Sequence, residues 1–332
     1  VLWTGNGGTN AITGVGFKPD WVWGKDRTGT DNHHLFDTTR GTNQRIISNL
    51  SAAENTESNC LDSFDSDGFT LGSNTGLNNN GDAHVAWNWK ANGGTTSSNT
   101  DGSITSTVQA STTSGFSIVT WTGTEANGTV GHGLGKRPEC IIVKTRGGDE
   151  NWVVRFKDTI TGNAFHKLHL NKTNAIAVDY TLGNMQDTSS SVFYLQNSGQ
   201  ENDSGQPMVA YCFAPIQGYS KFGSYTGNGS TDGIFVHTGF KPAWIMVKAT
   251  DVDEWRIYDH KRANAFNVIN VRLKAHTTAA ESQDDNECDF LSNGVKWRSN
   301  SGGVNSDGQK YIYMAFAEHP FVSSKGVPVT AR

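Results

Sequence analysis

A short phrase written three times constrains the fold of this 332-residue chain more than any other feature. Each copy has a glycine, a proline three residues later, and then a run of mostly apolar residues ending in lysine; the copies lie at 16–25, 135–144 and 239–248. Proline can occupy the first residue of a strand without losing a ladder hydrogen bond, so each phrase predicts a strand entered through a proline. A phrase repeated at this spacing indicates one structural unit used three times.

A second phrase closes each copy. It is a mostly apolar stretch at 84–91, 208–215 and 311–318, and each stretch follows a turn rich in Asn, Asp and Gly. Those residue types supply the positive φ angles that tight hairpins need. The glycine turn at 4–7 recurs at 226–229 but has drifted in the second copy, which argues for a structural turn and against a phosphate-binding loop.

Composition agrees with a β fold. The chain has 38 glycines and 10 tryptophans but is only 35% hydrophobic, which suits short strands and tight turns. Six or seven strand candidates per copy predict an all-β protein of three tandem antiparallel β-sandwich modules, jelly-roll or lectin-like, of about 100 residues each. The expected boundaries are 1–91, 114–217 and 218–320, with a Ser/Thr/Gly linker at 92–113 and a C-terminal tail at 321–332. One strand is expected near 104–108 and one helical turn within 48–58.

Charge and cysteine content exclude several classes. The net charge is −5 and no basic stripe occurs, so nucleic acid is not an expected partner. No apolar run of about 20 residues occurs, so membrane insertion is not expected. The four cysteines lack CxxC spacing and are predicted to be buried free thiols.

Motifs for catalysis or cofactors are missing from the sequence, which predicts no enzyme activity, no cofactor and no metal site. The acidic stretch at 62–68 resembles part of a calcium loop, but turn formation explains its aspartates better. The tryptophan pairs Trp21/Trp23 and Trp87/Trp89 share one strand face and are predicted to be core. Stacking platforms for sugar rings are instead expected at Tyr180, Trp255 and Trp297.

Several long phrases resemble an uncharacterised family of repeat proteins encoded mostly by tailed bacteriophages, particularly marine ones. They include "YTGNGSTDG" at 225–233, "GFKPAWIMVK" at 239–248, "SDGFTLGS" at 66–73 and the ending at 311–332. The resemblance spans essentially the whole chain. It implies a virion structural or tail-fibre-like protein, extracellular or on the virion, whose C-terminal end is natural and whose longer N-terminal part is absent here. It carries no catalytic residues.

The expected function is host attachment or glycan binding by repeated β modules, in a homo-oligomer that is a trimer or a filament. Host surface glycan is the expected ligand, because Asn-, Ser- and Thr-rich loops can hydrogen-bond sugars and several copies raise avidity. Two alternatives stay open: a self-assembling filament or capsid-decoration subunit, and a glycan depolymerase.

Overall fold

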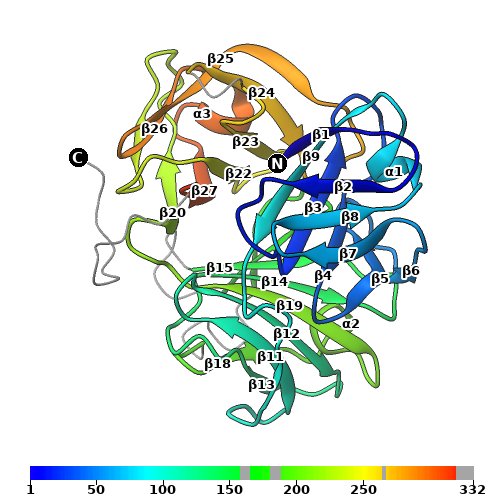
Figure 1. The fold of residues 1–332 in the computed structure, drawn as a ribbon. Coiled ribbons are helices and arrows are strands. Elements are labelled where there is room, and N and C mark those ends of the chain that lie inside the picture. Colours follow the sequence, from blue (N-terminus) through cyan, green and yellow to red (C-terminus); the bar gives the residue numbers. More distant parts are fainter. Residues whose placement is uncertain (158–164, 180–187, 264–266, 319–332) are drawn as a thin grey trace, which may run out of the picture.

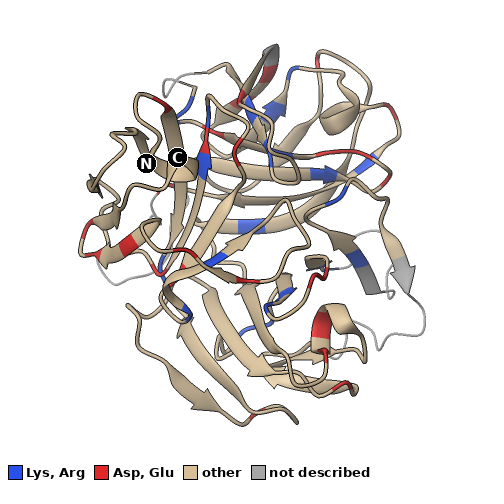
Figure 2. Ribbon diagram, turned by 90° about the vertical axis from the view of Figure 1, so that its right-hand side faces the viewer, with Lys and Arg blue, Asp and Glu red and all other residues tan. Residues whose placement is uncertain are grey.

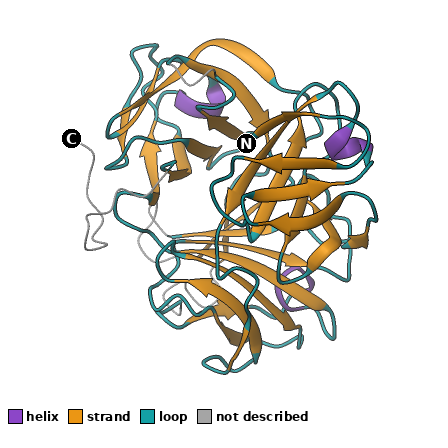
Figure 3. Ribbon diagram, in the orientation of Figure 1, coloured by secondary structure: helices purple, strands orange, loops and turns teal. Residues whose placement is uncertain are grey.

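The structure, a computed structural model, describes residues 1–157, 165–179, 188–263 and 267–318. Within these residues it has twenty-seven strands and three helices of four residues each (Figure 3). Neighbouring strands in the sheets run antiparallel. The predicted all-β, antiparallel class is therefore confirmed.

The chain is described below as three segments, residues 1–91, 92–217 and 218–318. The first contains β1 (Leu2–Thr4), β2 (Asn10–Thr13), β3 (Trp21–Asp26), β4 (His34–Asp37), β5 (Gly41–Ile47), β6 (Asn55–Thr56), β7 (Leu61–Asp65), β8 (Gly68–Leu71), α1 (Thr75–Asn78) and β9 (Ala83–Trp89). The second contains β10 (Ser97–Asn99), β11 (Ser106–Ser111), β12 (Phe116–Thr122), β13 (Gly128–Gly131), β14 (Cys140–Thr145), β15 (Val153–Phe156), β16 (Phe165–His169), β17 (Ala177–Asp179), β18 (Val192–Leu195), α2 (Gly199–Asn202) and β19 (Pro207–Phe213). The third contains β20 (Ser220–Thr226), β21 (Phe235–His237), β22 (Trp244–Ala249), β23 (Trp255–Asp259), β24 (Ile269–Lys274), β25 (Ser282–Leu291), β26 (Gly294–Trp297), α3 (Gly302–Asn305) and β27 (Lys310–Phe316).

One strand order recurs in the three large sheets. The opening strand pairs with the closing strand, which pairs with the proline-led strand, which pairs with the next strand along the chain. The orders are β1-β9-β3-β4, β12-β19-β14-β15 and β20-β27-β22-β23. Each segment therefore places its two repeated phrases side by side.

The proline-led strands β3, β14 and β22 are buried at every residue. Strands covered on one face alternate buried and exposed side chains, so continuous burial means that both faces are covered. One face of each large sheet meets the other two segments. The opposite face is covered within its own segment by a smaller group of strands: β2-β8-β7, β13-β18 and β21-β26-β25.

The centre of the molecule is one hydrophobic core shared by all three segments, which surround it in Figure 1. Aromatic rings join the segments in pairs. Trp21 stacks on Tyr211 with ring centroids 4.3 Å apart, Trp89 meets Trp244 at 5.7 Å, and Phe213 meets Phe316 at 5.8 Å. Each segment also has a core of its own on the outer face of its large sheet.

Hydrogen bonds repeat between the segments in the same cyclic sense. Trp152 Nε1 donates to the Ile47 carbonyl at 2.9 Å, from the second segment to the first. Trp255 Nε1 donates to the His169 carbonyl at 2.8 Å, from the third to the second. The third such contact joins the first segment to the third, with His33 Nε2 lying 3.0 Å from the Lys274 carbonyl oxygen. The three contacts close the arrangement into a ring.

Two local predictions are wrong. Residues 92–113 are not an extended linker, because β10 and β11 in this range form an edge of the second large sheet; the strand expected near 104–108 lies at Ser106–Ser111. No helical turn forms within 48–58, where residues 55–56 pair with β5 as β6. The short helices instead precede the three closing strands. The tail at 321–332 lies outside the described residues.

Two side-chain predictions are confirmed. Trp21, Trp23, Trp87 and Trp89 are buried in the shared core. All four cysteines are free and buried.

Candidate functional site

Two of the three expected sugar platforms, Trp255 and Trp297, are out of reach of a ligand. Trp255 is 1% exposed and Trp297 is fully buried, so the expectation that these rings face solvent is wrong. Trp255 reaches across to the second segment, and Trp297 packs against Tyr258 and Tyr225. Both lie in strands and not at loop tips. Tyr180 lies outside the described residues.

The acidic stretch at 62–68 forms a turn, as predicted. Asp67 accepts hydrogen bonds from the backbone N–H groups of Gly14 and Gly16, at 3.0 and 2.6 Å. Asp65 accepts from the hydroxyls of Ser63 and Thr70, both at 2.7 Å. Both carboxylates therefore hold β7, β8 and the neighbouring loop together. In the part of the chain that the structure describes, no group of three His, Cys, Asp or Glu residues could hold a metal ion.

One cysteine lies near a histidine, but its thiol is not activated as a nucleophile. Cys60 Sγ is 4.0 Å from His34 Nδ1, and both residues are buried. Burial raises the pKa of Cys60 to about 12 and lowers that of His34 to about 3. Both groups are therefore neutral near pH 7, whereas a nucleophilic cysteine needs a lowered pKa.

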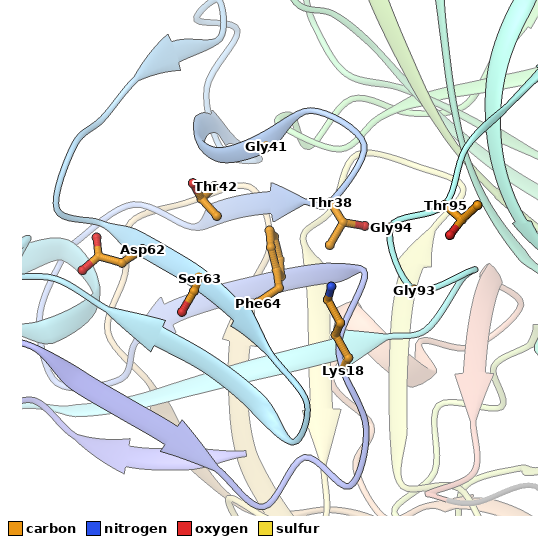
Figure 4. A pocket seen from close by; sticks show the side chains of 10 residues that line it. All are labelled: Lys18, Thr38, Gly41, Thr42, Asp62, Ser63, Phe64, Gly93, Gly94 and Thr95. Atoms are coloured by element: carbon orange, nitrogen blue, oxygen red, sulfur yellow. The ribbon is translucent and has the colours of Figure 1, made fainter.

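A groove of about 480 Å³ lies on the first segment, where its large sheet, its smaller sheet and the start of the second segment meet (Figure 4). Its lining comes from five stretches of chain: Lys18, Thr38, Gly41–Thr42, Asp62–Phe64 and Gly93–Thr95. Lys18 precedes β3, Thr38 follows β4, and the next two stretches belong to β5 and β7. No short motif spans these positions, which is why the sequence did not predict the groove.

A buried carboxylate and a buried amide fix one wall of the groove. Asp20 Oδ2 accepts the backbone N–H groups of Ala91 and Gly93 at 2.7 and 2.9 Å, and its other oxygen accepts the Thr38 hydroxyl at 2.9 Å. Gln109 Oε1 accepts the Gly94 N–H at 2.8 Å. Both acceptors are fully buried, so the wall is preorganised.

Gly93 and Gly94 have φ angles of +67° and +91°, a region that disfavours other residues. They let the chain turn tightly along the wall. A Cβ built at Gly94 would lie 4.0 Å from Lys18 Nζ, which places that amine close to the turn.

The groove is polar with one aromatic ring near its middle. Phe64 is half-buried and packs one side against the core of the first segment. Figure 4 shows Thr42 and Thr38 on either side of the ring and Thr95 beyond Thr38, with the Lys18 amine pointing into the space between Phe64 and Thr38 and Asp62 on the opposite side of the ring. Hydroxyl groups both donate and accept hydrogen bonds, and an aromatic ring offers a flat apolar face. The arrangement suits a ligand with many hydroxyls and one apolar face.

Charge elsewhere is mixed. Figure 2 shows Lys and Arg interspersed with Asp and Glu along the ribbon. In residues 1–157, 165–179, 188–263 and 267–318, no helix is long and apolar enough to cross a membrane.

Residues 1–320 match the model of a family described as a domain of unknown function, DUF7483. No curated protein and no solved structure matches the chain.

Proposed function

We propose, for a chain that belongs to the DUF7483 family, a non-enzymatic role as a glycan-binding structural protein of a virion surface. The groove around Phe64 carries this proposal. It is the place where a half-buried aromatic ring, the threonines Thr42 and Thr95 and two charged side chains border one open volume. Sugars bind proteins through just these two components, C–H faces on aromatic rings and hydroxyls on polar groups.

The framework that supports the groove is, in this proposal, a triplicated β-sandwich module, jelly-roll or lectin-like. Corresponding lysines support it. Lys25, Lys144 and Lys248 occupy the same place in β3, β14 and β22, and each amine donates to the carbonyl of the last residue of its strand and to one carbonyl of the turn that follows. Asn202 and Asn305, in the short helices before two closing strands, each donate to a carbonyl in the loop after the opening strand of their segment. A location on a bacteriophage tail fibre or similar appendage rests on the family resemblance of the repeated phrases.

The number of carboxylates at the groove favours a binding role over glycan cleavage. Glycosidases act with a pair of carboxyl groups that face each other across the scissile bond. Among the residues that line the groove, Asp62 is the single carboxylate. The buried carboxylate of Asp20 is already used by two backbone amides and a hydroxyl.

The second candidate is a self-assembling filament or capsid-decoration subunit. Exposed apolar side chains on β21 and β25, at one end of the eight-stranded sheet of the third segment, favour it: Phe235 is 42% exposed and Leu291 36%. A homo-oligomer, trimer or filament, is compatible with either role. Light scattering of the purified protein separates a monomer from an oligomer, and Phe235→Ser would dissociate an oligomer built on this sheet.

The test of glycan binding is retention on immobilised host surface polysaccharide. We expect the protein to be retained and Phe64→Ala to lose about fivefold or more in affinity, since losing a stacked ring costs about 1 kcal/mol or more. Tyr194→Ala, which removes a half-buried ring in the second segment, is the matched control and should leave retention unchanged. Equal retention of the Phe64 variant would contradict the proposal, and new reducing ends in the polysaccharide would identify an enzyme.

A further inference from the structure

The groove holds two side chains whose charges have no partner among the described residues. Lys18 takes part in no ion pair or hydrogen bond there, although its side chain is half-buried. Asp62 is exposed and likewise unpaired within the described ranges. They are the two charged residues of the lining, and they do not pair with each other.

The carboxylate nearest in sequence to Lys18 is committed elsewhere. Asp20 is fully buried and accepts the backbone amides of Ala91 and Gly93 together with the Thr38 hydroxyl. Its role is to hold the 91–95 turn against β4. The ammonium group of Lys18 therefore reaches the groove with its charge uncompensated by the protein.

A bound neutral sugar would cover that ammonium group. Covering an ion removes water from it, and the cost is offset only if the ligand supplies an opposite charge or strong hydrogen bonds. A carboxylate does so best, because it supplies the opposite charge as well as a charge-assisted hydrogen bond. At the far end, Asp62 can accept hydrogen bonds from sugar hydroxyls but repels a second anion.

We propose that the groove selects an acidic sugar and binds it in one direction. The carboxylate of a uronic or sialic acid residue lies against Lys18, its ring packs on Phe64, and its hydroxyls point toward Asp62 and the threonines. This inference rests on the proposed glycan-binding function, and it adds the charge of the ligand and its orientation.

The chain contains its own control for Lys18. Lys241 stands at the same place in the third copy of the repeated phrase, two residues after a glycine and directly before Pro242. It is exposed and unpaired among the residues described, and it does not line the groove. Lys241→Ala therefore removes an equivalent charge from the equivalent turn.

The experiment measures affinity by calorimetry for matched pairs of oligosaccharides, each pair an acid and its methyl ester. Galacturonate, glucuronate and sialic acid oligomers are the three acids. We expect at least one acid to bind about tenfold more tightly than its ester at 0.1 M salt, and the difference to shrink at 1 M salt because salt screens the contact. Lys18→Ala should abolish the difference, Lys18→Arg should retain most of it, and Lys241→Ala should leave it intact.

Two failures are distinguishable. Equal binding of acids and esters, lost in Phe64→Ala, would overturn the selectivity and leave glycan binding standing. Binding of none of the six probes, together with no retention on host polysaccharide, would overturn both. A preference for the acid that survives Lys18→Ala would also overturn the inference, because the selectivity would then arise elsewhere.

Discussion

Glu54 and Arg146, 92 residues apart, form a two-pronged ion pair that joins the first segment to the second. Arg146 Nε and Nη2 donate to the two carboxylate oxygens of Glu54 at 2.9 and 2.6 Å, and the Glu54 backbone N–H donates to the Arg146 carbonyl at 2.8 Å. Glu281 and Arg27 repeat this arrangement between the third segment and the first, at 3.0 and 2.7 Å. At the junction between the second and third segments, the Ile176 N–H donates to the Thr250 carbonyl in the same way. Isoleucine and threonine have no charged side chain, so these two residues form no ion pair.

Glu54→Gln should destabilise the protein by about 2–4 kcal/mol, because it removes a charge that also pairs with the buried Arg40. Glu57→Gln breaks the more exposed pair with Arg45 and should cost less than about 1 kcal/mol. Urea unfolding monitored by tryptophan fluorescence measures both. Equal losses of unfolding free energy would show that the ion pairs of Glu54 stabilise the protein no more than the exposed Glu57–Arg45 pair does.

The same residue predicts acid sensitivity. Burial alone would raise the pKa of Glu54, but the guanidinium groups of Arg146 and Arg40 outweigh it and hold that pKa below its ordinary value of 4.5. The stabilising contribution is therefore present above pH 4.5 and is lost as pH falls through the lower, folded value. The free energy of unfolding of wild type should approach that of Glu54→Gln as the pH is lowered below 4.5. A gap that stays constant down to pH 3 would contradict this assignment.

The three buried lysines predict an unusual alkaline response. Burial lowers the pKa of Lys25, Lys144 and Lys248 to about 8, against 10.5 for an exposed lysine. Between these values the unfolded chain binds more protons than the folded one, so the contribution of these groups to stability rises with pH from about 8 to 10.5. The stability of wild type relative to Lys144→Met should therefore increase from pH 8 to pH 9.5.

The control for that measurement is Lys90→Met, at an exposed lysine. Its stability relative to wild type should not change over the same range. A parallel response of the two variants would show that the Lys144 amine keeps an ordinary pKa.

Asn305 should not tolerate aspartate. Its Nδ2 donates to Asn228 Oδ1, the Ser230 carbonyl and the Ser299 carbonyl, at 2.8 to 3.0 Å, and the residue is fully buried. A carboxylate has the same shape but cannot donate these bonds, so Asn305→Asp should cost about 2–4 kcal/mol at pH 7. Asn43→Asp, at an exposed side chain, should change stability by less than about 0.5 kcal/mol. Thermal and urea unfolding decide the comparison.

The two tryptophans that are not sugar platforms make a matched structural pair. Trp255 Nε1 donates across a segment junction, whereas Trp297 Nε1 is buried without a hydrogen-bond partner among the described residues. Both substitutions to phenylalanine lose ring volume, but only Trp255→Phe also removes a hydrogen bond, after which the His169 carbonyl keeps the Lys172 N–H alone. It should therefore cost about 0.5–1.5 kcal/mol more than Trp297→Phe. Neither substitution should alter glycan retention. A selective loss of retention in one variant would identify that ring as a ligand contact.

Local signals predicted the strands well. The prolines at 19, 138 and 242 mark the entries to β3, β14 and β22, and the turns rich in Asn and Gly mark the approaches to the closing strands. These signals act over a few residues, through φ preferences and missing donors, so the sequence displays them directly. The alternation in Trp21/Trp23 and Trp87/Trp89 likewise predicted burial.

Tertiary placement was predicted less well. Trp21 stacks on Tyr211, 190 positions away, and no local pattern reveals that the segments share one core. Trp255 and Trp297 were expected to serve as exposed sugar platforms, yet both are buried inside strands covered by another layer. The groove combines Lys18, Thr38, Phe64 and Gly94, whose proximity depends on how the first segment meets the chain at 91–95.

The Arg27–Glu281 contact has a consequence for how such a protein could change in evolution. Stacked repeat arrays have two free ends and can grow by adding a unit at either one. Here the third segment bonds to the first, so in the proposed triplicated framework a fourth unit could be inserted only by breaking an existing junction and widening the aromatic centre. In that framework geometry sets the number of copies, and sequence change is accommodated in the loops and outer surfaces of each segment.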